Sequence, residues 1–158
     1  MRNIPAVLLI LILIASCDQN EKLTDITMHC EFHEYLLTPC FYGIHNFSRD
    51  EIVIRNNAAY LKFQDSIRIE IYEMNCEDEQ LPSIDFERYT LIGKKTFGGG
   101  CSVQYRRKIF DDKANNLIRY KISARYSGDC AMGLVSWNWA LIPSIPDYYM
   151  VVFEVREL

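Results

Sequence analysis

Residues 102–126 read SVQYRRKIFDDKANNLIRYKISARY and contain the most regular pattern of the chain. Residues 102–110 and 117–126 are rich in β-branched and aromatic side chains, which is typical of strands. Between them, residues 111–116 hold two aspartates and two asparagines, which favour turns. The stretch therefore predicts two strands separated by a turn.

Three neighbouring runs, residues 89–96, 132–142 and 148–155, have a similar composition. Turn-forming residues separate all five runs, among them the triple glycine 98–100 and the Gly128-Asp129 pair. Short strands with regular turns predict a mainly β (α+β) fold. We expect an antiparallel β-meander that forms a curled sheet or a partly closed barrel.

The segment before these strands predicts one further strand and a small helical element. Residues 51–55, EIVIR, form a short β-branched run. Residues 57–64 are expected to form one or two helical turns that cover one face of the sheet. In residues 67–71, three isoleucines alternate with charged residues, which favours a strand and leaves a helix as the alternative.

The N-terminus has the pattern of an export signal. Arg2 precedes an apolar run over residues 4–14, and Ile14-Ala15-Ser16-Cys17 follows. This resembles a bacterial lipoprotein signal peptide with its lipobox, and the apolar run is too short to span a bilayer. The resemblance implies cleavage before Cys17 and acylation of that cysteine. We therefore expect a signal peptide at 1–16, a lipidated tether at 17–27 and a single β-rich domain at 28–158.

The acidic residues Asp18 and Glu21 follow the predicted lipid site. An aspartate there resembles an inner-membrane retention signal of enteric bacteria, whereas acidic residues near the cysteine also resemble a surface-export signal of Bacteroidetes-type lipoproteins. The expected location is the cell envelope. The outer membrane or the cell surface is favoured over the inner membrane.

Six cysteines in an exported chain indicate disulfides, because the compartment beyond the cytoplasmic membrane is oxidising. Lipidation of Cys17 would leave five, which allow two bridges at most. These five are Cys30, Cys40, Cys76, Cys101 and Cys130. We predict the pairs Cys101–Cys130 and Cys30–Cys40.

No motif of the chain matches an established catalytic pattern. His29-Cys30-Glu31-Phe32-His33 has the histidine spacing of the HExxH metalloproteases but lacks the glutamate that acts as the base. With Cys40 and His45, a zinc site is conceivable, but the spacings match no standard zinc pattern. We expect no metal, no cofactor and no enzymatic activity.

Charge argues against a nucleic-acid partner. The formal net charge is −4, whereas nucleic-acid-binding domains present a basic face. Arg106-Arg107-Lys108 is the one basic cluster, and we interpret it as the solvated face and end of a strand.

Two aromatic pairs could form a ligand platform. Trp137 and Trp139 lie two apart on an expected strand and therefore share a face, and Tyr148 and Tyr149 follow. A buried face would make the tryptophans core residues, which is the favoured interpretation. An exposed face would provide a stacking surface for a sugar or a peptide.

The order of several short motifs resembles two families. The motifs are Ile84-Asp85-Phe86, the run 89–93, Gly98-Gly99-Gly100-Cys101, Gly128-Asp129-Cys130, Asn138-Trp139 and the run 149–155. Over residues 50–156 this order is similar to small Bacteroidetes-type lipoproteins of uncharacterised function. It also resembles the protease-complex-inhibitor-like domain, although this chain has Cys101 where that pattern has tyrosine.

These observations favour a non-enzymatic protein-binding module. The predicted anchor and the inhibitor-like resemblance imply a partner in the envelope, such as a protease or another envelope complex. The alternative is a lipoprotein that binds a glycan or a small ligand through the exposed aromatics. A third class, a metal-dependent enzyme around His29, His33 and His45, lacks the required base.

Overall fold

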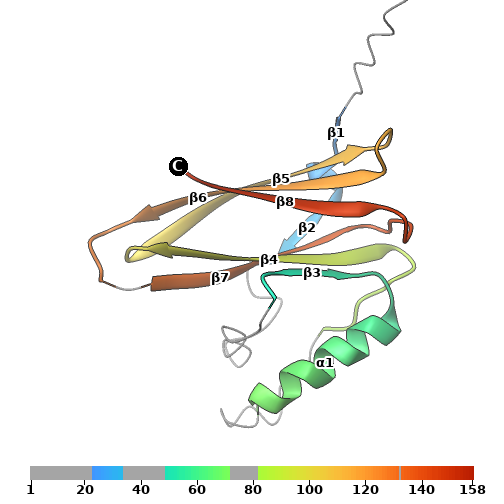
Figure 1. Cartoon of the computed structure of the whole chain (residues 1–158), viewed down its shortest axis with the longest axis horizontal. Coiled ribbons are helices and arrows are strands. Elements are labelled where there is room, and N and C mark those ends of the chain that lie inside the picture. Colours follow the sequence, from blue (N-terminus) through green and yellow to red (C-terminus); the bar gives the residue numbers. More distant parts are fainter. Residues whose placement is uncertain (1–22, 34–48, 72–81, 132) are drawn as a thin grey trace, which may run out of the picture.

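The computed structural model describes residues 23–33, 49–71, 82–131 and 133–158. Of residues 67–71 it describes the backbone alone. Two four-stranded sheets stack on each other (Figure 1). The elements are β1 (Thr24–Asp25), η1 (Thr27–His29), β2 (Glu31–His33), β3 (Glu51–Ile54), α1 (Asn57–Ile71), β4 (Tyr89–Gly99), β5 (Ser102–Asp112), β6 (Leu117–Ser127), β7 (Gly133–Pro143) and β8 (Met150–Glu157). The helix α1 covers the face of the sheet containing β3 and β4 that points away from the other sheet. The mainly β prediction with one helix is confirmed.

The strand order differs from a meander. Sheet A has the order β1-β5-β6-β8, and sheet B has the order β2-β7-β4-β3. The strands β4 and β5 follow each other in the chain but lie in different sheets, and β4 pairs with β7 instead. Every pairing is antiparallel except that of β6 with β8, which is parallel. The meander expectation is wrong because passage between sheets lets the inner faces of both sheets bury one another.

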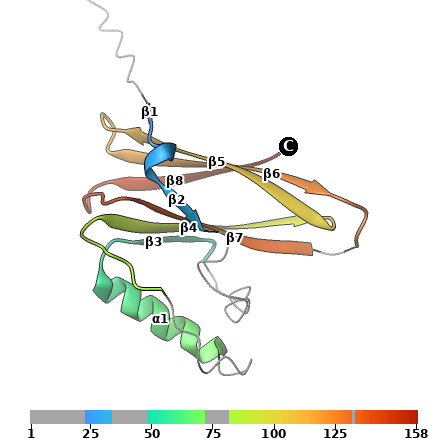
Figure 2. The same cartoon turned by 180° about the vertical axis from the view of Figure 1, so that it is seen from behind.

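One side of the sandwich is crossed by the chain and the other side is open. The segment β1-η1-β2 runs from sheet A to sheet B along one side (Figure 2). On the opposite side, β8 and β3 are the outermost strands of their sheets (Figure 1). Within the described ranges no strand joins β8 to β3, so the two sheets do not close into a barrel there.

Residues 24–27 belong to the fold rather than to a tether. Thr24 and Asp25 pair with Asp111 and Phe110 of β5, and Ile26 packs against the core between the sheets. The amide of Ile26 donates to the carbonyl of Ile109 at 2.9 Å. Residues 24–27, which the sequence assigned to the tether, therefore lie on sheet A, because backbone pairing with β5 and the packing of Ile26 hold them there.

The core between the sheets consists of alternate residues of the central strands. Side chains along a strand point to opposite faces in turn, so every second residue of each sheet meets the other sheet. Its fully buried members are Ile92, Ile109, Ile118, Tyr120, Ile122, Ala140 and Ile142. The intervening residues of β5 and β6 consequently point away from the sandwich.

The helix α1 buries the far face of sheet B. Asn56 caps it, because its Oδ1 accepts the amide hydrogen of Ala59 at 2.8 Å. Tyr60 and Phe63 of the helix pack with Leu91 and Trp139 of the sheet. The predicted strand at 67–71 is wrong, because the helix continues to residue 71. The same isoleucines also fit a helix, because residues 63, 67 and 71 are four positions apart and therefore share one helix face.

The disulfide Cys101–Cys130 agrees with the pairing expected from the sequence, with an S–S distance of 2.02 Å. It joins the β4–β5 connection to the β6–β7 connection, two of the four places at which the described chain changes sheet. Gly100 adopts φ +144° in the first of these turns, a conformation that disfavours other residues. The bridge therefore holds together the ends of both sheets.

The predicted Cys30–Cys40 bridge is wrong, because the thiol of Cys30 is free. Its Sγ donates to the carbonyl of Ile26 at 3.2 Å, and the residue packs against the core between the sheets. Cys40 lies outside the described residues. The inward direction of Cys30 follows from the packing of η1 and β2 against the core, which cysteine spacing does not reveal.

We expect Cys30 to react slowly with alkylating reagents in the native protein. Burial raises the pKa of its thiol to about 12, and the Asp25 carboxylate adds to this effect. Because the thiolate is the reactive form, iodoacetamide at pH 8 should modify native Cys30 at least about a hundredfold more slowly than the unfolded chain. Peptide mass spectrometry measures both rates. Similar rates in native and denatured protein would contradict this burial.

Candidate functional site

The histidines of the HxxxH segment do not share a helix face. His29 ends η1 and His33 lies in β2, where its Nε2 is 3.6 Å from a carboxylate oxygen of Glu31. Within the described residues, no group of three His, Cys, Asp or Glu side chains is placed to hold a metal ion. Cys40 and His45, the other two candidates, lie outside the described residues.

The four candidate platform aromatics do not form one surface. Trp139 is 1% exposed and stacks on the partly buried Trp137, with ring centroids 4.9 Å apart, on the helix-facing side of sheet B. Tyr148 is 68% exposed and lies with Tyr149 immediately before β8 of sheet A. The favoured interpretation of the tryptophans as core residues is confirmed, and the alternative of an exposed platform is wrong for them. Gly93, directly opposite Trp139, leaves room for the ring, because a Cβ at Gly93 would lie 2.3 Å from it.

The basic triplet divides between the interior and the surface. Arg107 points inward, and its Nε donates to Oδ1 of Asn138 at 2.8 Å. Asn138 in turn donates to Thr96, whose hydroxyl is 2.8 Å from that of Tyr105. The guanidinium also lies over the Tyr105 ring, 4.9 Å from its centroid. This buried network satisfies polar groups between the sheets, which is a structural role.

Two surfaces of the described structure could bind a partner, and the first is the outer edge of β8, where backbone groups are unpaired. The amides of Met150 and Leu158 donate to Asn116 and Ala124 of the β6 side. Backbone N–H and C=O groups alternate in direction along a strand, so those of Val151, Phe153 and Val155 point away from β6. Among the described residues, β8 pairs with β6 alone. The outward groups therefore form an unpaired strand edge.

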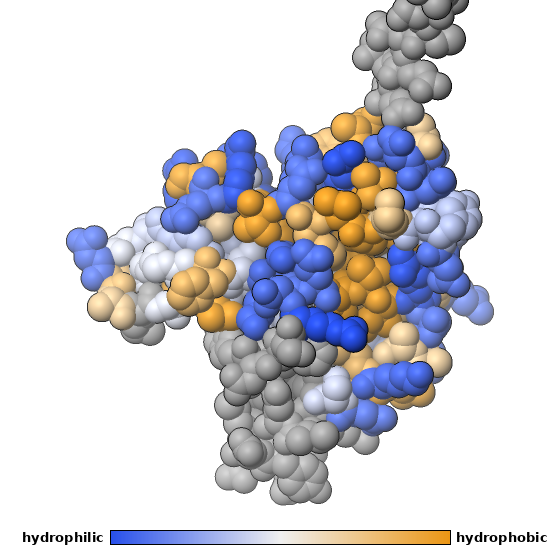
Figure 3. All heavy atoms as spheres, viewed as in Figure 1, coloured by the Kyte–Doolittle hydropathy of each residue, from blue (hydrophilic) through white to orange (hydrophobic). Residues whose placement is uncertain are grey.

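Apolar side chains accompany this edge. Val151 and Phe153 are half-buried between the sheets and Val155 is 45% exposed. Figure 3 shows apolar residues gathered on the side of the sandwich where β8 and β3 lie. Residues 150–153 carry no charge, although exposed edges are usually protected by charged residues, prolines or bulges. This edge is therefore suited to accept another strand.

The opposite edge strand of sheet B is less suited to pairing. The strand β3 has four residues, and the carbonyl of Asp50 and the amide of Lys95 already bond it to the β4 side. Arg55, directly after β3, donates from Nη2 to the carbonyl of Tyr149 at 2.7 Å. This contact links the end of β3 to the start of β8 and positions the β8 edge at the open side.

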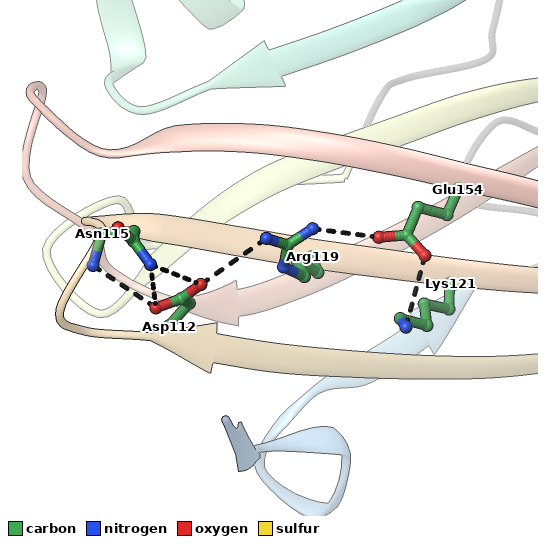
Figure 4. Close-up of polar contacts among 5 residues, drawn as sticks. All are labelled: Asp112, Asn115, Arg119, Lys121 and Glu154. Carbon is green, nitrogen blue, oxygen red and sulfur yellow. Dashed lines mark hydrogen bonds and ion pairs between the residues drawn. The ribbon is translucent and has the colours of Figure 1, made fainter. Parts of the chain in front are cut away.

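The outer face of sheet A is the second surface, and we call it the basic face. It is formed by the outward residues of β5, β6 and β8, and its basic members are Arg106, Lys108, Arg119, Lys121, Arg125 and Arg156. Figure 4 shows Glu154 between Arg119 and Lys121, with Asp112 on the other side of Arg119. These two carboxylates are the acidic members of the face.

Sequence reasoning missed the basic face. The triplet at 106–108 looked like three adjacent charges, but only Arg106 and Lys108 share a face. The available signal was the alternation of basic with apolar residues in 118–122, next to the basic residues of 106–108. Combining the two runs requires the β5–β6 register, which places Lys108 opposite Lys121.

Comparison with known proteins found no matching family model, no matching curated protein and no matching solved structure. The resemblances to Bacteroidetes-type lipoproteins and to the protease-complex-inhibitor-like domain stay predictions. In the part of the chain that the structure describes, no helix is long and apolar enough to cross a membrane.

Proposed function

We propose that this protein is a non-enzymatic, lipid-anchored protein-binding module of the cell envelope. Its partner contributes an extended segment that pairs with the outer edge of β8. The single observation that carries this proposal is the unpaired edge of β8, uncharged over residues 150–153 and flanked by half-buried apolar side chains. Lipidation of Cys17 supplies the location, and the inhibitor-like resemblance suggests a protease or an envelope complex as the partner.

Strand addition fits the chemistry of this edge. Main-chain hydrogen bonds supply affinity in such complexes, and alternate side chains of the added strand supply specificity. The outward N–H and C=O groups of Val151, Phe153 and Val155 can pair with an incoming strand, while their side chains continue the apolar layer between the sheets. The partner's apolar residues would extend that layer on the open side.

A proline scan at the edge tests the proposal. In Val155→Pro, only an outward-pointing N–H is lost, because the even-numbered residues of β8 bond to β6. Proline is tolerated at such edge positions. The expected result is about a tenfold loss of the crosslinked partner in cells, since one interface hydrogen bond contributes about 1 kcal/mol and the ring obstructs pairing. Val155→Ala, which also shortens the side chain but keeps the N–H, is the matched control and should lose much less of the partner than Val155→Pro.

Amide hydrogen exchange gives an independent readout. In the free protein, the amides of Val151, Phe153 and Val155 should exchange fast, while those of Val152 and Glu154 are protected by β6. The complex should protect the first set. Cys17→Ser should lose the partner through loss of the anchor alone. Equal capture by the proline and alanine variants, with unchanged exchange at the odd positions, would overturn the proposal.

A further inference from the structure

The basic face concentrates positive charge in an otherwise acidic protein. Together with Asp25 of the neighbouring β1, which pairs with Phe110, it holds six basic and three acidic side chains, whereas the whole chain has a formal charge of −4. Lys108 and Lys121 stand directly opposite each other on β5 and β6. Like charges in that position repel each other, so this arrangement costs stability in the isolated domain. A nearby anionic partner would relieve the repulsion.

Much of this charge has no acidic neighbour. The carboxylate of Glu154 lies 3.3 Å from both Arg119 and Lys121, and that of Asp112 lies 3.6 Å from Arg119. Within the described ranges, no ion pair involves three other exposed members of the face. These are Arg106, Lys108 and Arg125. The Asp25 carboxylate of β1 interacts electrostatically with Lys108, so that lysine is partly balanced, and Arg106 and Arg125 form the uncompensated part of the face.

Apolar side chains stand beside charged ones at the other end of the same face. The β5–β6–β8 register places Phe110, Arg119 and Val152 in one row, and the next row contains Asp112, the buried Leu117 and Met150. Met150 is 63% exposed and Val152 is 38% exposed. Exposed apolar side chains next to basic ones are typical of surfaces that lie at the boundary of an anionic bilayer. Nucleic-acid sites would not require the apolar rows.

The chain that follows the predicted lipid site joins sheet A in the row that contains the apolar residues Phe110 and Val152. Asp25 of β1 pairs with Phe110, and the chain preceding Thr24 runs toward Asp112 because β1 is antiparallel to β5. Thr24 is the seventh residue after Cys17, which limits their distance to about 25 Å. An acylated Cys17 would therefore keep sheet A, rather than α1 on the other side of sheet B, close to the membrane.

We infer that the basic face lies on the anionic headgroups of the membrane that holds the lipid anchor. The phosphates contact the uncompensated basic residues, and Met150 and Val152 reach the boundary with the acyl chains. In this orientation sheet B and α1 face away from the membrane, and the outer edge of β8 points along its plane. This inference rests on the proposed anchoring and adds an orientation from which the β8 edge meets partners at the membrane surface.

Lysine footprinting of the lipidated full-length protein tests the orientation. The protein is reconstituted in phosphatidylcholine vesicles with and without about one third phosphatidylglycerol, and an amine-reactive ester labels exposed lysines. Each basic residue near an anionic surface strengthens binding about fivefold. We therefore expect labelling of Lys108 and Lys121 to fall at least fivefold with phosphatidylglycerol and to recover in about 1 M salt. Lys62, exposed on α1, is the internal control and should be unaffected.

Charge reversal supplies matched variants. Lys108→Glu should restore labelling of Lys121 on anionic vesicles, whereas Lys62→Glu should change nothing. Equal labelling of Lys108, Lys121 and Lys62 on both kinds of vesicle would overturn the inference. So would tighter binding of an oligonucleotide than of anionic vesicles, because it would assign the face to nucleic acid. The mass of the N-terminal peptide reports lipidation of Cys17 separately, so failure of the anchor is distinguishable from failure of the orientation.

Discussion

Replacement of Trp139 by alanine is expected to lower the free energy of unfolding by about 4 kcal/mol. The side chain is 1% exposed and packs between sheet B and the helix α1. Its ring stacks on Trp137 and meets the Phe63 ring of α1 edge to face, with centroids 5.9 Å apart. Removal of the ring would leave a cavity that the strand and helix backbones cannot close, so the full cost of a large-to-small substitution applies.

Denaturant unfolding followed by circular dichroism measures this change. Tyr148→Ala is the matched aromatic control, because that ring is 68% exposed and its loss should change stability by less than about 0.5 kcal/mol. If Trp139→Ala cost no more than Tyr148→Ala, the packing of α1 on sheet B would be incorrect. Gly93→Ala should also destabilise, since the added methyl would meet the Trp139 ring.

Removal of the disulfide by Cys101→Ser with Cys130→Ser is expected to cost about 3.5 kcal/mol. The two cysteines are 29 residues apart, so the bridge restricts the unfolded chain strongly. It also holds together the β4–β5 and β6–β7 connections, at both of which the chain passes from one sheet to the other. Loss of the bridge should therefore allow both connections to fray.

Unfolding of the unaltered protein in a reducing agent is the control for the double variant. The two should share the same lowered midpoint, because both lack the bridge. Hydrogen exchange should rise first at the ends of β4 and β7, next to the bridge. A double variant within about 1 kcal/mol of the oxidised protein would contradict a stabilising role for the disulfide.

Strand content was predictable because it depends on local patterning. The runs 102–110 and 117–126, rich in β-branched and aromatic residues, correspond to β5 and β6. The turn residues between the runs correspond to the connection between these strands. Where two local patterns coincided, as in residues 67–71, the choice depended on the rest of the molecule. There the preceding capped helix extends through an ambiguous stretch.

Strand partners were not predictable in the same way. The parallel pairing of β8 with β6 joins segments separated by one strand, and the pairing of β4 with β7 joins segments separated by two. Such pairings depend on which faces can be buried together, and turn chemistry between neighbours does not encode this. The free thiol of Cys30 has the same origin, because the packing of η1 and β2 directs it inward.

The sequence by itself determined the mainly β class, the turn positions and the expectation of an anchor at Cys17. Each of these follows from residue types within short stretches of chain. Only the tertiary structure decided which edge stays open and which charges share a surface. The β8 edge and the basic face exist because the register of β5, β6 and β8 aligns residues that are distant in sequence. A side chain's direction is a local property of its strand, whereas its neighbours on the sheet are set by long-range pairing.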